Sequence, residues 1–221
     1  IDAKTNLPAP EYIPPPNTPA PPEVTSDTHP HEGSWYKGHT AHFTWDVPSG
    51  VLNVRTAFDR NPLTIPTVVY DEPIREKTID DIEEGVSYFH IQFKNADGWG
   101  RVTHFKIQVD NTEPSAFTIT ETTLTSAEAV RTFRFDVEDM SPVDRYTIIL
   151  DGAPGIEWKR TNEGELYHTE ALPPGDHTLV VTAYDSAGHS RTATLTFTVA
   201  SLPPPRLTEY PDRFPSSVTP L

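Results

Sequence analysis

A repeat with a period of 90 residues is the feature that most constrains the fold of this chain. Residues 85–109 align with residues 175–199 without an insertion, and the offset of 175 − 85 = 90 places Gly98 on Gly188. The same offset aligns three more pairs upstream: Phe43 with Phe133, Trp45 with Phe135 and Asp46 with Asp136. A period of this length indicates an array of similar domains. Arrays act mainly through their length and surface, so a catalytic pocket is the less favoured interpretation.

Within each repeat, apolar and polar residues alternate along short segments. Residues 89–94 and 105–109 alternate in the first repeat, as do residues 179–183 and 195–199 in the second. This is the pattern of antiparallel strands with one face in a core and one face in water. Turn signals built from Gly, Asp and Asn separate the segments. The spacing predicts an all-β fold with two tandem antiparallel β-sandwich domains of about seven short strands each.

Proline marks the expected domain boundaries. Residues 1–22 contain eight prolines and almost nothing able to form a core, a composition that favours an extended, semi-rigid spacer. We therefore expect a proline-rich linker at 1–22 and sandwich domains at 23–112 and 113–200. Residues 201–221 are interpreted as a second linker or as the start of a truncated further repeat.

The charge balance excludes some classes of partner. The 221 residues include 32 Asp and Glu but 17 Lys and Arg, a formal net charge of −15. This charge repels phosphate backbones, so nucleic acid is not an expected partner. The absence of cysteine excludes a disulfide scaffold and a thiolate metal site. No apolar run approaches the ~18 residues needed to cross a bilayer, so no direct membrane insertion is expected in this segment.

Several segments resemble known β-sandwich families. In the first repeat the resemblance is to a fibronectin type III-like module and is carried by Trp45, 58–62 and 88–100. In the second it is to a bacterial Ig-like domain and is carried by 139–152, 175–181 and 183–190. The resemblance covers residues 23–200 and implies tandem repeats of a large bacterial surface protein. One departure is that Ser87 and His177 stand where the sixth strand of such modules often has a tyrosine.

The resemblance implies a non-catalytic structural spacer or adhesion module of an extracellular or cell-surface multidomain protein. Its partners would be neighbouring domains of the same polypeptide, and surface glycans or proteins. A pair of accessory domains on an exported enzyme is a further interpretation. The chain itself is not expected to be an enzyme, because it has no Gly-x-Ser-x-Gly elbow and no His-Glu-x-x-His helix to position catalytic groups.

Aromatic residues in loops are the candidates for ligand binding. Trp35, Tyr36 and Trp99 lie in loop contexts, with Asp97 close to the last of them. Aromatic faces on a β-sandwich can stack on sugar rings, so these four residues are the candidate carbohydrate- or protein-binding site. The alternative is that Trp35 and Trp99 cap the ends of the core, because a tryptophan buries more area than most residues.

Acidic residues gather where the first repeat ends. Asp110, Asn111 and Glu113 lie at the junction, and Glu138 and Asp139 end a strand directed towards it. Ca²⁺ prefers six to eight oxygen ligands from flexible carboxylate-rich loops, so these five residues are the candidate Ca²⁺ site. Several Ig-like bacterial adhesin repeats bind calcium in this way. The alternative is a solvated acidic junction, since there is no Asp-x-Asp-x-Asp-Gly loop. No other cofactor is expected.

Two histidines are expected to face each other. His90 and His104 both point outward if Phe89 and Phe105 point into the core, and on paired strands they would lie within about 5 Å. Structural zinc requires four ligands, so this pair is interpreted as ordinary surface histidines.

Overall fold

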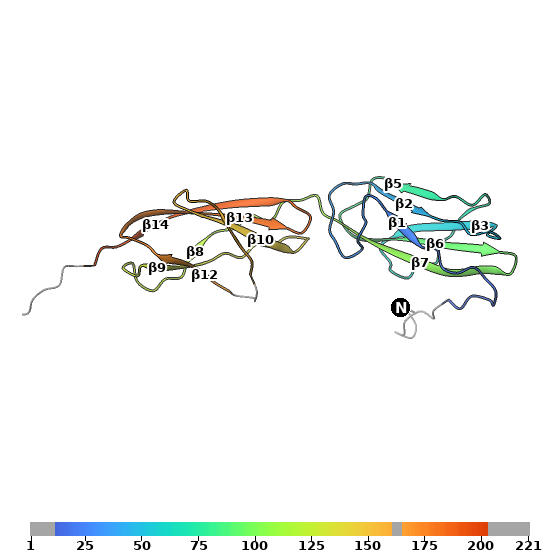
Figure 1. Ribbon diagram of the computed structural model, residues 1–221, viewed down its shortest axis with the longest axis horizontal. Coiled ribbons are helices and arrows are strands. Elements are labelled where there is room, and N and C mark those ends of the chain that lie inside the picture. The colour runs from blue at the N-terminus through green and yellow to red at the C-terminus, as the bar shows by residue number, and fades with distance from the viewer. Residues whose placement is uncertain (1–11, 161–164, 203–221) are drawn as a thin grey trace, which may run out of the picture.

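Two β-domains lie end to end along the long axis of the molecule (Figure 1). The computed structural model describes residues 12–160 and 165–202. Over these ranges the chain forms strands and turns and contains no helix, hence none long and apolar enough to span a membrane.

The first domain consists of two antiparallel sheets. Three strands form one sheet in the order β1-β2-β5, and four form the other in the order β4-β3-β6-β7. The strands are β1 Val24–Ser26, β2 Ala41–Trp45, β3 Asn53–Asp59, β4 Val68–Tyr70, β5 Glu76–Ile79, β6 Gly85–Asn95 and β7 Gly98–Val109. The long β6–β7 hairpin is the element that the 90-residue repeat predicts most clearly.

The second domain repeats this arrangement. Its sheets have the orders β12-β9-β8 and β11-β10-β13-β14, again three strands against four. The strands are β8 Thr120–Glu121, β9 Val130–Arg134, β10 Val143–Leu150, β11 Ile156–Trp158, β12 Tyr167–Ala171, β13 Gly175–Asp185 and β14 Ser190–Val199. The same strand order in both domains confirms the predicted tandem antiparallel β-sandwiches.

Each domain has its own hydrophobic core. Phe89 and Leu179, which occupy equivalent positions of the repeat, are both fully buried. In the first core Phe43 stacks on Phe89 with ring centroids 4.3 Å apart. The second core is built in the same way, with Phe133 against Phe197 at 5.0 Å. The alternation of apolar residues therefore places the larger side chains between the two sheets of each domain, as the sequence predicts.

The described part of the proline-rich segment, residues 12–22, packs against the first domain. Thr103 on β7 donates a hydrogen bond to the carbonyl oxygen of Pro22 at 2.5 Å, and Asn95 donates to that of Asn17 at 2.8 Å. Tyr12 donates its hydroxyl to the carbonyl oxygen of Trp99 at 3.0 Å. The segment therefore lies along the outer edge of β7, which ends the four-stranded sheet.

The rest of that edge is covered by residues from the loop before β2. The Glu32 carboxylate accepts the Lys106 amide at 2.9 Å. Further along, the Tyr36 amide donates to the carbonyl oxygen of Gln108, and the Asp110 amide donates to that of Tyr36, both at 3.0 Å. An open strand edge is a template for pairing with another chain, and a proline-rich cover with few N–H donors removes that template.

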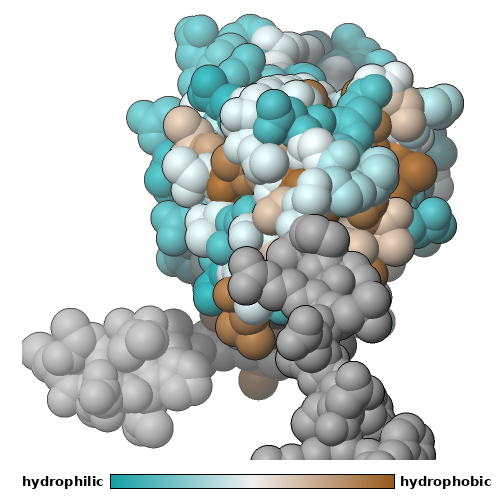
Figure 2. Space-filling view, turned by 90° about the vertical axis from the view of Figure 1, so that its left-hand side faces the viewer, coloured by the Kyte–Doolittle hydropathy of each residue, from teal (hydrophilic) through white to brown (hydrophobic). Residues whose placement is uncertain are grey.

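Polar residues cover most of the visible end of the second domain, with brown hydrophobic residues dispersed among them (Figure 2). The exposed apolar side chains of the second domain include Leu124, Val130 and Ile156. This mixture is typical of sheets that have one face in the core and the other in water.

Gly100 provides a test of the edge cover. A Cβ at this position would lie 2.1 Å from the carbonyl oxygen of Pro19, so the Gly100→Ala variant must displace residues 12–22. We expect amide hydrogen exchange along the start of β7 to accelerate by about tenfold or more. Gly33→Ala is the matched control, because no atom lies within 4 Å of a Cβ there. Unchanged exchange in the Gly100→Ala variant would contradict this packing.

Candidate functional site at the domain junction

The site at the junction is formed by the end of the first domain and two loops of the second. Strand β7 ends at Val109, and residues 110–114 lead directly into the second domain. Strand β13 is antiparallel to β14, so it ends at the pole of the second domain that faces the first. The turn after β13, residues 186–189, and the loop before β10 therefore both meet the end of β7.

Asp110 connects the two domains through its buried carboxylate. Its Oδ1 accepts the amide of Thr112 at 3.0 Å and the hydroxyl of Thr112 at 2.9 Å. Its Oδ2 accepts the amide of Ser141, which belongs to the second domain, at 3.2 Å. Burial alone would raise the pKa of Asp110, but the hydrogen bonds from Ser141 and Thr112 outweigh it and hold the pKa below its usual value.

Two more side chains cross the junction, and a third binds the linking segment. Lys37 of the first domain donates from Nζ to the carbonyl oxygen of Gly188 at 2.7 Å. His189 donates from Nε2 to the carbonyl oxygen of Asp110 at 3.2 Å. Arg191 donates from Nε to the carbonyl oxygen of Pro114 at 3.1 Å and pairs with the Glu113 carboxylate at 3.2 Å. The domains are thus docked against each other as well as tethered.

Three carboxylates converge at this docked surface. Asp110, Asp139 and Asp185 each place one carboxylate oxygen within 4.8 Å of the other two. Asp185, the last residue of β13, is 2% exposed, and Asp139 lies in the loop before β10. Burial first, and then the negative charges of Asp110 and Asp185, raise the pKa of Asp139 to about 6. The arrangement concentrates negative charge in a poorly solvated place.

The structure brings together two of the five residues that the sequence indicated for Ca²⁺, Asp110 and Asp139. The other three side chains have different roles or lie at the surface. Asn111 accepts the Gly38 amide through Oδ1 at 2.6 Å, and Glu113 pairs with Arg191. Glu138 is exposed, and its backbone carbonyl accepts the Ser115 amide at 2.9 Å.

Asp185 completes the cluster and was missed in the sequence. The available signal was strand direction. The last strand of a domain ends at the pole from which the chain leaves the domain. Its hairpin partner is antiparallel to it and therefore ends at the opposite pole. For the second domain this opposite pole faces the first domain, and Asp185 is the residue that ends the hairpin partner β13.

The structure does not bring the four candidate ligand-binding residues together. Tyr36 is paired with the end of β7 at Val109, and Trp35 precedes it. Asp97 and Trp99 lie at the other end of the same strand, about 35 Å away for eleven extended residues. Both groups belong to the first domain, one at each pole, so they do not form one sugar-binding platform.

Trp99 is covered by neighbouring cations. The guanidinium carbon of Arg55 lies 4.3 Å from the centroid of the Trp99 ring, and Lys94 Nζ lies 5.7 Å from it. These cation–π contacts occupy the half-buried ring and disfavour stacking on a ligand, but the ring packs against cations and not on the core, so it does not cap the core either. At the junction pole, the Tyr36 hydroxyl is bonded to the His31 amide at 3.0 Å.

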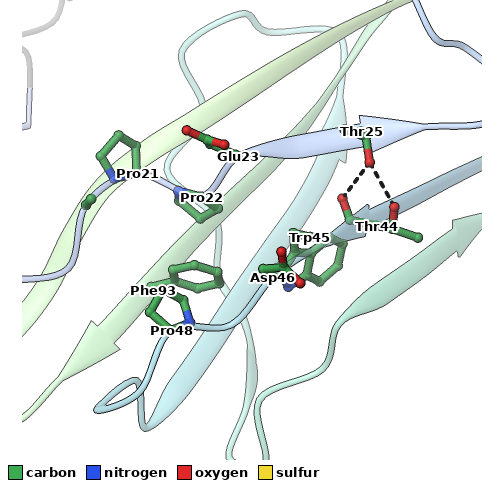
Figure 3. A pocket seen from close by; sticks show the side chains of 10 residues that line it. Pro21, Pro22, Glu23, Thr25, Thr44, Trp45, Asp46, Pro48 and Phe93 are labelled. Carbon is green, nitrogen blue, oxygen red and sulfur yellow. Dashed lines mark hydrogen bonds between the residues drawn. The ribbon is translucent and has the colours of Figure 1, made fainter.

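A cavity of about 470 Å³ opens at the pole of the first domain away from the junction. Figure 3 shows its lining, with Trp45 and Phe93 from the core and prolines from the N-terminal segment. The carboxylates of Glu23 and Asp46 also line it. By the 90-residue offset, Ala20 and Glu23 of this cavity correspond to Asp110 and Glu113. The cavity therefore lies at the pole of the first domain that is equivalent to the junction pole of the second domain.

The predicted cross-strand pair of histidines is present, but His90 is fully buried, so its interpretation as a surface residue was wrong. Asp59, the last residue of β3, lies 3.2 Å from His90 Nε2. His90 Nδ1 and His104 Nδ1 are 2.7 Å apart, closer than the about 3.3 Å between two nitrogens on a tetrahedral zinc. The two histidines form a hydrogen-bonded chain with Asp59. His104 donates from Nδ1 to His90 Nδ1, and His90 donates from Nε2 to the Asp59 carboxylate.

Two solved structures similar to this chain are arrays of fibronectin(III)-like domains. One is of the Clostridium thermocellum CbhA fibronectin(III)-like modules, with a TM-score of 0.41, 19% identity, and coverage of 80% of this chain and 94% of that one. The other is of chicken CNTN1 FN1–FN3 domains, with a TM-score of 0.41, 16% identity, and coverage of 85% and 68%. Both domains here have the same β-sandwich strand order, with three strands against four. No protein-family model and no curated protein matches the chain.

The pKa values of histidines in the two β-sandwich domains shift in opposite directions. Burial lowers the pKa of His29, His90 and His104 in the first domain. In the second, the Asp151 carboxylate 2.7 Å from Nδ1, and then the carbonyl oxygen of Pro173, raise the pKa of His177 above 6.5. A histidine whose pKa is lowered on folding, such as His90, contributes stability that is present above pH 6.5 and is lost as the pH falls. A histidine whose pKa is raised on folding, such as His177, contributes stability that is present below pH 6.5 and is lost as the pH rises.

We therefore expect the two domains to respond oppositely to pH. Between about pH 5 and about pH 8.5, the first domain should lose stability towards acid, while His177 makes the second lose stability towards alkali. Urea unfolding followed by NMR peaks of each domain measures both responses. In His177→Asn the alkaline loss in the second domain should shrink while the first domain is unchanged. A common direction in both domains would refute this assignment.

Proposed function

We propose that this chain is a non-catalytic spacer segment of a cell-surface or secreted multidomain protein, in which the two domains hold a fixed alignment. The observation that carries the proposal is the docked junction: Lys37, Asp110 and His189 make hydrogen bonds across it, and Arg191 binds residues 110–114, which join the domains. A spacer presents its neighbours at a set distance and angle, so it requires a joint of this kind rather than a flexible linker.

The charge and the surface support this role. A net charge of −15 keeps an extended module soluble and apart from other acidic polymers. The covered edge of β7 protects the first domain against unwanted strand pairing, which benefits a module that is held close to copies of itself. The candidate sugar-binding aromatics lie at opposite poles, and this separation disfavours a carbohydrate-binding function for the pair of domains.

Residual dipolar couplings test the fixed alignment. In the wild type, couplings from both domains should fit one alignment tensor. Removing one crossing contact and one contact to the linking segment in the Lys37→Ala/Arg191→Ala variant should cost about 1–2 kcal/mol of docking free energy, so the two domains should then require separate tensors. Lys159→Ala/Arg134→Ala is the control, because these residues form ion pairs within the second domain. Independent tensors in the wild type would refute the proposal.

A further inference from the structure

We propose that Asp110, Asp139 and Asp185 bind one Ca²⁺ ion that cross-links the two domains. The inference rests on the proposed spacer function, because the cation would stabilise the same docked junction. Its ligands come from three separate places in the chain: the end of β7, the loop before β10 and the end of β13. Such a site exists only while the domains are docked, so the binding of the cation and the alignment of the domains are linked.

The spacing of the carboxylates suits this ion. Ca²⁺–oxygen distances of about 2.4 Å allow ligands on opposite sides of the ion to be about 4.8 Å apart. The three carboxylate oxygens lie within 4.8 Å of one another. An all-oxygen set favours Ca²⁺ or Mg²⁺ over zinc. Mg²⁺ demands near-ideal octahedral geometry and keeps its water, so carboxylates from three separate segments fit the more flexible coordination of Ca²⁺ better.

The side chain of Asp185 is the independent observation that points to a cation. It is 2% exposed, and its Oδ1 accepts the His189 amide at 2.8 Å. Its other oxygen, Oδ2, is buried and has no hydrogen-bond partner among the residues that the structure describes. A buried carboxylate oxygen without a partner is costly, because it has lost its water and gained nothing in exchange.

The charge of the cluster is also uncompensated. Within residues 12–160 and 165–202, no Lys or Arg forms an ion pair with any of the three carboxylates. Lys37, the cation that crosses the junction, directs its ammonium to the carbonyl oxygen of Gly188. Three carboxylates at this spacing repel one another, and a divalent cation would turn that repulsion into attraction.

The ligands are held in place by hydrogen bonds that leave lone pairs free. Asp110 is fixed by Thr112 and Ser141, and Asp139 Oδ2 accepts the hydroxyl of Ser141 at 3.3 Å. Each ionised carboxylate offers about four acceptor sites, so each of the three retains capacity for the ion. Ser141 thus positions two ligands, one through its amide and the other through its hydroxyl.

Titration of the full chain with CaCl₂ in about 0.15 M salt tests the site. Isothermal calorimetry should show one Ca²⁺ per chain, with a rise in melting temperature. Asp185→Asn keeps the oxygen that accepts the His189 amide but removes the charge, so it should bind about tenfold or more weakly. Glu138→Gln is the control: its residue is exposed and next to Asp139, and the variant should bind like the wild type. MgCl₂ should bind more weakly than CaCl₂.

A second measurement separates a ligand from an ordinary structural carboxylate. In chelator, Asp185→Asn should melt at or above the wild-type temperature, because it relieves repulsion; only in Ca²⁺ should the wild type be the more stable. No binding up to about 10 mM CaCl₂, or equal binding by Asp185→Asn and the wild type, would overturn the inference.

The outcomes for the site and for the spacer can be told apart. If Ca²⁺ does not bind but both domains fit one alignment tensor in chelator, the cation site is wrong and the fixed spacer stands. If Ca²⁺ binds but the domains need separate tensors with it present, the fixed spacer is wrong and the site stands.

Discussion

The structure depends on a buried carboxylate at the point where the first domain ends. Asp110 follows the last residue of β7 directly, and its side chain accepts the Ser141 amide of the second domain. A charged group in this position requires partners, because burying it without them is costly. The second domain supplies one of those partners, so the hydrogen bonds of the Asp110 carboxylate are complete only in one orientation of that domain. Without this requirement, five linking residues would leave the two sandwiches free to pivot.

Covering the last strand of a sheet is the other constraint that the first domain meets. Strand β7 carries unpaired backbone groups along its outer side, and the chain satisfies or shields them with residues 12–22, Glu32 and Tyr36. Gly100 allows the backbone of Pro19 to approach closely. A segment with the composition of a spacer therefore acts as part of the domain, because its carbonyl oxygens accept hydrogen bonds and it has few N–H donors.

The alternation of apolar and polar residues predicted the fold, because every second residue of a strand in a β-sandwich faces the core. Phe89 and Leu179 are buried where the repeat places them, and His90 faces His104 in the predicted register. The site was predicted less completely, since it depends on which pole each strand end reaches. Asp110 and Asp139 were recognised as acidic residues near the junction, whereas Asp185 lies 75 residues beyond Asp110 in the sequence (185 − 110 = 75) and meets it only through strand direction. The burial of His90 was also outside what alternation reports, because it depends on the neighbouring side chains of Asp59, Tyr88 and His104.

The cavity in Figure 3 has a mechanical consequence for an array of such modules. Subtracting 90 from the three carboxylate positions gives Ala20, Ser49 and Asn95, so the equivalent pole of the first domain lacks all three negative charges. Joints made at the two poles would then differ in compliance, even though the modules share one strand plan. A pulling force would be absorbed unevenly, with bending concentrated at the pole that lacks the three-carboxylate cluster. Rigidity in such a chain is thus decided joint by joint, by a few residues at each pole.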